Sequence, residues 1–231
     1  MCGRFFLFAD VDTVQASFPQ LVIPDAPDVL PPRYNIAPGQ PVAVVANTPE
    51  KRLDYFLWGL VPSWAKDIGI TSRLINARVE TLAEKPAFRA ALRRRRCLIL
   101  ADGFFEWYQE PGATKKTPLA FRLRSGKPFA FAGLWEVWFA PDGSEIRSCT
   151  IITTAANALV ERFHTRMPII LDPAQYDAWL NPEEASPEVL TALLHPVPVT
   201  EMIAFPVSTL VNNARINLPA CVEAVGTPIT L

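Results

Sequence analysis

Short apolar runs rich in aromatic and β-branched residues recur along the chain, and turn residues bound most of them. Runs of this length and composition are typical of β-strands. Asp142-Gly143, between two such runs, is a strong signal for a tight hairpin. We expect strands at residues 4–8, 42–46, 52–58, 97–108, 118–123, 129–139 and 146–154.

Helical patterns are fewer and irregularly placed. Asp172 and Ser186 each precede a proline, which is typical of a helix N-terminus. The proline-rich stretch 23–40 predicts a long ordered loop, and the Arg93–Arg96 run a solvated helix end. Because strands come in runs without regular strand–helix alternation, we expect one α+β domain over residues 1–231, with a mainly antiparallel, barrel-like sheet and a few flanking helices. The helices are expected at residues 81–95, 157–163, 173–180 and 186–194.

Charge is unevenly distributed along a chain whose net charge is only −1. Residues 1–141 hold 18 Lys/Arg and 13 Asp/Glu, while residues 142–231 hold 4 and 10. This asymmetry fits either a basic face that meets a polyanion or ordinary solvated charges. Charge alone does not choose between them.

The cysteines and histidines indicate neither a metal site nor a cofactor. The four cysteines lie far apart without a Cys-x-x-Cys pair, and there are two histidines. No secretion signal and no apolar run long enough for a membrane span is visible in the sequence. We therefore expect a soluble cytoplasmic protein with free thiols, no metal and no membrane partner.

Cys2 is the most informative candidate for chemistry because it follows Met1 directly. Removal of Met1 would leave an α-amine and a thiol on adjacent carbons, with ordinary pKa values of roughly 8 and about 8.5. Such a pair can capture one aldehyde carbon twice, first as an imine and then as a thiazolidine ring. The competing interpretation is a small buried residue at the start of a strand.

Reactive polar residues also interrupt three apolar segments elsewhere in the chain. Asn76 lies in residues 74–80, Glu106 interrupts an aromatic run, and His164 is one of the two histidines. A desolvated carboxylate has a raised pKa, which suits proton transfer near neutrality. Taken singly, each residue also fits a structural role.

Taken together, the segments resemble the SOS-response-associated peptidase (SRAP) family, proteins that crosslink themselves to abasic sites in DNA. The resemblance covers nearly the whole chain in family order. It departs from the family near the C-terminus, where Ile216 and Asn217 stand in place of a common Asn-Asp pair. The matching segments are residues 1–5, 33–38, 58–64, 76–80, 103–107, 131–136, 164–168 and 207–208.

The resemblance implies that the α-amine of Cys2 attacks the sugar aldehyde and that its thiol then closes the thiazolidine ring. Asn76 would hold the sugar oxygen or the amine, and Glu106 would act as general acid and base. His164 would protonate the sugar oxygen as the ring opens, or assist release.

The expected partner is single-stranded DNA containing an abasic site, bound by a monomer. Arginine side chains match phosphates well, and exposed aromatic rings can stack on bases. Phe104, beside the site, could also stack on a base, although core packing is the competing interpretation. The candidates for DNA contact are Arg4, Trp64, Arg78 and Arg166.

Two other functions fit the same sequence. In an N-terminal-nucleophile peptidase the Cys2 thiol would attack an amide, including the bond after Met1, with its own amine as base. A non-catalytic single-stranded-DNA-binding module would keep Trp64 and the arginines and would tolerate loss of Cys2. A crosslinker is consumed stoichiometrically, whereas a peptidase turns over.

Overall fold

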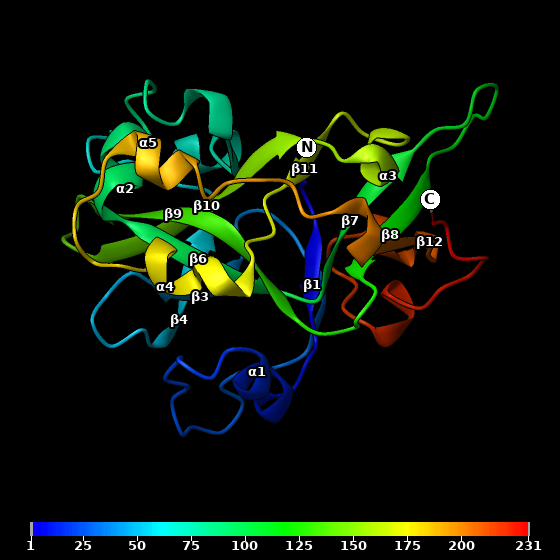
Figure 1. The fold of residues 1–231 in the computed structure, drawn as a ribbon, viewed down its shortest axis with the longest axis horizontal. Coiled ribbons are helices and arrows are strands. Elements are labelled where there is room, and N and C mark those ends of the chain that lie inside the picture. The colour runs from blue at the N-terminus through cyan, green and yellow to red at the C-terminus, as the bar shows by residue number, and fades with distance from the viewer. Residues whose placement is uncertain (1, 231) are drawn as a thin grey trace.

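The computed structural model, which describes residues 2–230, contains two β-sheets that lie side by side (Figure 1). The first sheet has the strand order β12-β8-β7-β1-β2, and all its neighbours are antiparallel. Its outer strand β12 is covered by the C-terminal segment, where Ile229 and Ala204 exchange both backbone hydrogen bonds. The strands are β1 (Phe5–Leu7), β2 (Arg33–Ile36), β7 (Gly103–Tyr108), β8 (Thr117–Leu123) and β12 (Met202–Pro206).

The second sheet closes on itself. Its order is β11-β10-β4-β3-β6-β9, and β9 pairs again with β10, so that β4, β3, β6, β9 and β10 form a ring. The pairings are antiparallel except those of β10 with β4 and β5. The expected α+β fold with a mainly antiparallel, barrel-like sheet is therefore confirmed. The strands are β3 (Pro41–Ala46), β4 (Leu53–Trp58), β5 (Asn76–Arg78), β6 (Arg96–Ala101), β9 (Phe129–Phe139), β10 (Glu145–Ala155) and β11 (Arg166–Pro168).

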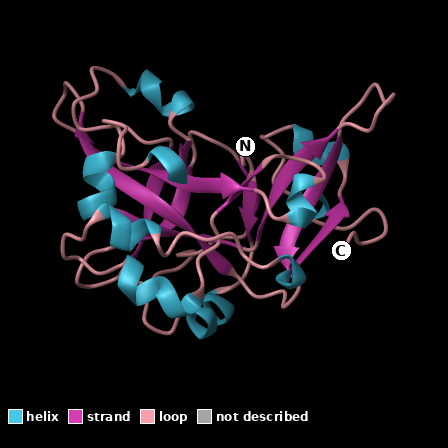
Figure 2. Ribbon diagram, turned by 45° about the horizontal axis from the view of Figure 1, so that its top comes forward, coloured by secondary structure: helices cyan, strands magenta, loops and turns pink. Residues whose placement is uncertain are grey.

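The helices are short and lie around the outside of the sheets (Figure 2). Asn157 and Ser186 cap α3 and α5 with their side chains, and Asp10 caps α1, a helix that the sequence did not predict. Within residues 2–230 no helix is long and apolar enough to cross a membrane. The α-helices are α1 (Val11–Ser17), α2 (Arg89–Arg94), α3 (Ala158–Glu161), α4 (Tyr176–Trp179) and α5 (Pro187–Thr191), and 3-10 helices cover Ile68–Arg73, Val79–Thr81, Pro173–Gln175, Val199–Glu201, Thr209–Asn212 and Pro219–Cys221.

The predicted single strand at residues 97–108 is wrong, because Asp102 divides it between the two sheets. Its buried carboxylate accepts hydrogen bonds from the backbone N–H groups of Phe8 and Ala9, at 2.6 and 2.8 Å. Burial raises the pKa of Asp102. The carboxylate thus holds a corner at which the chain passes from β6 in one sheet to β7 in the other.

Three other predictions need correction. The helix expected at residues 81–95 is an α-helix only over Arg89–Arg94, since Pro86 has no N–H and disfavours helical backbone before it. The loop expected at 23–40 contains the strand β2. The Arg93–Arg96 run is not uniformly solvated, because Arg96 is completely buried and donates to backbone carbonyl oxygens.

The two sheets share one aromatic core. Phe5 of β1 packs edge-on against Trp58 and Phe131 of the closed sheet, with ring centroids 5.0 and 5.6 Å apart. Phe104 is fully buried and stacks on Phe121 at 5.0 Å. Phe104 therefore belongs to the core, and its suggested role in base stacking is wrong. This core fixes the start of β1, and with it Cys2, relative to both sheets.

Candidate active site

Cys2 lies where the two sheets meet, in the segment that leads into β1. The antiparallel pairing of β1 with β7 matches Phe5 with Phe104, and continuing that register places Gly3 level with Glu106. On the other side, the side-chain amide of Asn76 donates to the carbonyl oxygen of Cys2 at 2.7 Å. The sequence-predicted residues Cys2, Asn76 and Glu106 are thus brought together. Met1, whose removal the chemistry requires, lies outside the described residues.

Glu106 is a carboxylic acid in an apolar setting, with only 5% of its surface exposed. It lies on β7 between the buried Phe105 and the half-buried Trp107. Burial raises the pKa of Glu106 to about 7, against the opposing positive charge of Lys116. At neutral pH the carboxyl therefore exists in both protonation states, as a group that moves protons must.

The Cys2 thiol is held in its protonated form. The side chain is completely buried, and its sulfur lies 3.8 Å from the carbonyl oxygen of Arg4. Burial raises the pKa of the Cys2 thiol, and the negative charge of Glu106 adds to this effect. The thiol therefore needs a base to become a nucleophile. Glu106, whose charge acts on it directly, is the acidic group suited to accept that proton.

Asn76 begins β5, which pairs with the C-terminal half of β10. Its amide nitrogen is used by Cys2, whereas its buried amide oxygen has no hydrogen-bond partner among residues 2–230. An unsatisfied buried acceptor is costly, so a donor supplied by a substrate would be bound favourably here.

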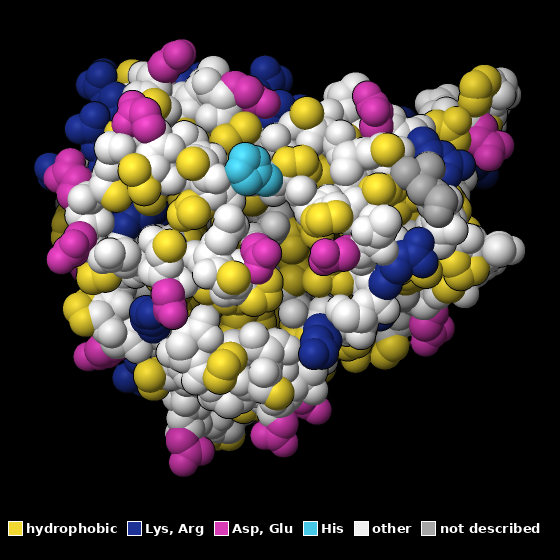
Figure 3. Space-filling view, in the orientation of Figure 1, with side chains coloured by type: hydrophobic (Ala, Val, Ile, Leu, Met, Phe, Trp, Pro, Cys, Tyr) yellow, Lys and Arg dark blue, Asp and Glu magenta, His cyan; other side chains and the backbone are white. Residues whose placement is uncertain are grey.

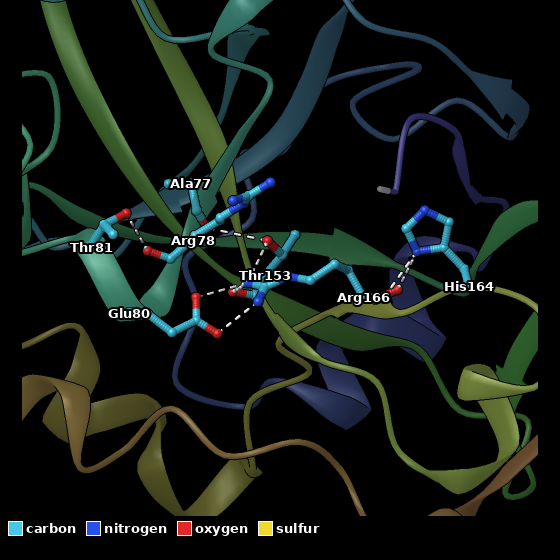
Figure 4. A network of polar contacts seen from close by, with 7 residues as sticks. All are labelled: Ala77, Arg78, Glu80, Thr81, Thr153, His164 and Arg166. Carbon is cyan, nitrogen blue, oxygen red and sulfur yellow. Dashed lines mark hydrogen bonds and ion pairs between the residues drawn. The ribbon is translucent and has the colours of Figure 1, made fainter.

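His164 lies between α3 and β11, and its ring is oriented by one neighbouring peptide (Figure 4). The backbone N–H of Arg166 donates to Nδ1 at 3.0 Å, and the Arg166 carbonyl oxygen lies 3.1 Å from the same nitrogen. Burial lowers the pKa of His164, and the positive charges of Arg166 and Lys116 lower it further. Because Lys116 acts on both His164 and Glu106, these two side chains share one electrostatic environment.

The four side chains that are predicted to contact DNA differ in their exposure and in their hydrogen bonds within the protein. Trp64 has 59% of its surface exposed, and Arg78 is exposed at the end of β5. Arg4 donates to the Asn35 side chain and to the Val211 carbonyl oxygen, both at 2.7 Å. Arg166 is bonded to both carboxylate oxygens of Glu80, at 2.6 and 3.0 Å. Trp64 and Arg78 are therefore the most exposed of the four, and the DNA contacts of all four residues stay predictions.

An open cleft beside the site contains functional candidates that the sequence did not reveal. It has a volume of about 500 Å³, and the Arg4 guanidinium lies over the Trp107 ring, 5.6 Å from its centroid. Lys115 and Lys116 could have been noticed as a basic pair after the turn at Pro111-Gly112, but nothing local linked them to Glu106. The cleft is lined by Arg4, Trp107, Lys115, Lys116, Thr209 and Asn212.

At the departure from the family pattern, Asn217 takes part in two local hydrogen bonds. The Asn217 side-chain oxygen accepts from the backbone N–H of Tyr34 at 2.7 Å. Its amide nitrogen donates to the Pro32 carbonyl oxygen at 3.4 Å. An amide oxygen thus serves as the acceptor where the family commonly has a carboxylate.

Comparisons with known proteins identify the family of the chain. The abasic site processing proteins YoqW of Bacillus subtilis and HMCES of rat are 43% and 31% identical to the chain; the alignments cover 97% and 84% of this chain and 100% and 65% of those proteins. A solved Bacteroides thetaiotaomicron protein is 26% identical, with a TM-score of 0.85 over 96% of this chain and 99% of its own. The sequence profile described as SOS response associated peptidase (SRAP) matches residues 1–214. The chain therefore belongs to the SRAP family.

Proposed function

We propose that this protein captures abasic sites in single-stranded DNA by forming a covalent bond through Cys2, and thereby protects the damaged strand from cleavage. The observation that carries the proposal is the position of Cys2 between Asn76 and the buried Glu106. The names of the relatives, which are abasic site processing proteins, support the substrate.

The first step requires the α-amine of Cys2, which becomes available when Met1 is removed. An abasic sugar in its ring-opened form carries an aldehyde at C1′. The amine nitrogen attacks this carbon, and the resulting carbinolamine loses water to give an imine. Glu106 accepts a proton from the attacking amine and returns it to the departing hydroxyl, which its pKa of about 7 permits. His164 is suited to protonate the ring oxygen of the sugar as it opens.

The second step converts the imine into a stable ring. The Cys2 thiol gives its proton to Glu106, and the sulfur adds to C1′ while the imine nitrogen takes up a proton. The product is a thiazolidine, and one water is lost overall. Because the C=N bond is gone, β-elimination of the neighbouring phosphate, which would break the strand, is no longer favoured.

The DNA would be held without sequence readout. Exposed Trp64 could stack on a base, which is worth about 1–3 kcal/mol. Arg78, together with Lys115 and Lys116 of the cleft, could contact phosphates, so binding should weaken steeply as salt rises. We expect the protein to act as a monomer in the cytoplasm.

The test is the intact mass of the trimmed protein before and after incubation with an oligonucleotide containing one abasic site. We expect a 1:1 adduct that survives denaturant and has lost one water relative to the sum of its parts. Cys2→Ala should give no stable adduct, while Cys221→Ala, which removes another buried cysteine, should react like wild type. Full crosslinking by Cys2→Ala would exclude the thiazolidine.

The same arrangement also suits a peptidase, because a buried acid beside an N-terminal cysteine can serve amide cleavage as well. The family description includes that activity. Amide substrates would then be turned over many times, whereas the crosslinker stops after one event. Retention of Met1 when Cys2 is replaced by alanine would indicate that the protein removes its own first residue.

A further inference from the structure

The Arg166 side chain forms a strap across the strand β10 (Figure 4). Its guanidinium donates to both carboxylate oxygens of Glu80, and also to the carbonyl oxygen of Thr153 at 2.6 Å and the Thr153 hydroxyl at 3.3 Å. The Arg166 side chain is only 17% exposed. The hydrogen bonds from Arg166 lower the pKa of Glu80, which keeps the pair ionised at neutral pH.

The strap links the segment that follows Asn76 to the segment that follows His164. β5 pairs with residues 151–153 of β10 and begins with Asn76, while β11 pairs with residues 153–155 and follows His164. Glu80 belongs to the turn that leaves β5, and Arg166 is the first residue of β11. A three-residue strand has few backbone hydrogen bonds, so a bidentate ion pair adds substantially to its positioning.

The strap ends at the peptide that orients His164. The N–H of Arg166 can donate to Nδ1 of the neutral ring, and the carbonyl oxygen can accept from Nδ1–H of the cationic ring. The same residue therefore holds the imidazole in either charge state. When the Arg166 N–H donates to Nδ1, the neutral ring carries its proton on Nε2.

We propose that Glu80 is a positioning residue for His164 and Asn76, acting through Arg166 rather than on the substrate. The effect of this positioning on adduct formation rests on the proposed function, but the orientation of the His164 ring can be measured without DNA. In this arrangement the Arg166 guanidinium is bonded to Glu80 and to Thr153 within the protein.

The test compares Glu80→Ala and Glu80→Gln with Asp54→Ala. Asp54 is a matched control, because it is also half-exposed and pairs with an arginine of β10, Arg147, in the other half of that strand. Three quantities are measured: the rate of adduct formation, the affinity for undamaged single-stranded DNA, and the ¹⁵N signals of the His164 ring. The second histidine, His195, is an internal reference.

We expect Glu80→Ala to slow adduct formation by about 10- to 100-fold, as small displacements of reacting groups do. Affinity for undamaged DNA should stay within about twofold, because Glu80 is an acidic residue and the proposed phosphate contacts Arg78, Lys115 and Lys116 are unchanged in this variant. The ¹⁵N signals should change from a single Nε2–H form to a mixture of tautomers. Glu80→Gln keeps a hydrogen-bond acceptor, so its rate and its ¹⁵N signals should lie between those of wild type and Glu80→Ala. Asp54→Ala should match wild type in all three quantities.

Unchanged rates and unchanged ¹⁵N signals in Glu80→Ala would overturn the inference. A loss of DNA affinity in parallel with the rate would overturn it as well, because Glu80 would then act through DNA binding. If wild type formed no adduct, the proposed function would fail instead, and the ¹⁵N signals alone would decide the positioning.

Discussion

At the scale of single residues, Glu106 shows how burial alone creates reactivity. A carboxyl on an exposed strand would be ionised at neutral pH, but this one is 5% exposed among aromatic neighbours and titrates near pH 7. The sequence offered burial as one of two possibilities, since a charged residue that interrupts an aromatic run either lies at the surface or is desolvated. It could not predict Lys116 as a neighbour, because a lysine in an exposed loop carries no periodic signal.

Glu106→Gln should stabilise the protein at high pH. The folded state binds the Glu106 proton more tightly than the unfolded state, so the stability it contributes is complete below pH 4 and is lost as the pH rises through 7. The glutamine variant does not lose this stability, because its side chain does not ionise. Its free energy of unfolding should exceed that of wild type by about 3 kcal/mol at pH 8 and by nearly nothing at pH 4.

Urea unfolding at the two pH values measures this difference. The same variant should form the DNA adduct slowly at both, because it cannot exchange protons. A stability difference that is equal at pH 4 and pH 8 would show that Glu106 does not titrate near neutrality.

At the scale of elements, the corrections share a cause: contacts between distant segments decided what local patterns could not. Residues 97–108 read as one strand, and only the backbone N–H groups of Phe8 and Ala9, nearly 100 positions away, explain why Asp102 breaks it. The four arginines at 93–96 look alike in the sequence. Only the fold distinguishes Arg96, whose guanidinium is surrounded by carbonyl oxygens.

Arg96→Met should therefore cost about 3–5 kcal/mol of stability, because it leaves several buried carbonyl oxygens without donors. These oxygens belong to the end of α2, to the last residue of α4 and to the segment after α4, which Arg96 connects at the start of β6. Arg94→Met is the control: its side chain is 65% exposed and paired with Glu184, so the change should stay within about 1 kcal/mol. Chemical denaturation measures both. Equal effects would show that the buried hydrogen bonds add nothing.

At the scale of the whole molecule, the two sheets share one aromatic core, and we expect them to unfold as one unit. The class of fold followed from the sequence, because runs of strands without regular helices leave few architectures. The sequence did not predict the closure of β9 on β10 or the parallel pairing of β10 with β4 and β5, since these depend on long-range register. Acidic and basic side chains are intermixed on the face shown in Figure 3, so the charge asymmetry along the chain gives no single-sign surface there.

Phe131→Ala tests whether the two sheets unfold together. Phe131 lies on β9 and contacts Phe5 and Phe104 of the other sheet, so its loss should cost about 3–5 kcal/mol. Phe139→Ala, on the same strand but 64% exposed, should have little effect. Tryptophan fluorescence and far-ultraviolet circular dichroism should report one shared transition in both variants. Two separate transitions would show that the sheets unfold independently.

The pairing of Ile229 with Ala204 has a consequence for handling this protein. A sheet whose last strand exposes a row of N–H and C=O groups is a template for the corresponding strand of another molecule. Here a few residues of the tail occupy that template. Shortening the chain before residue 229 would therefore expose the edge of β12 to pairing with other molecules. The shortened protein should aggregate on concentration even though every residue around Cys2 remains in place.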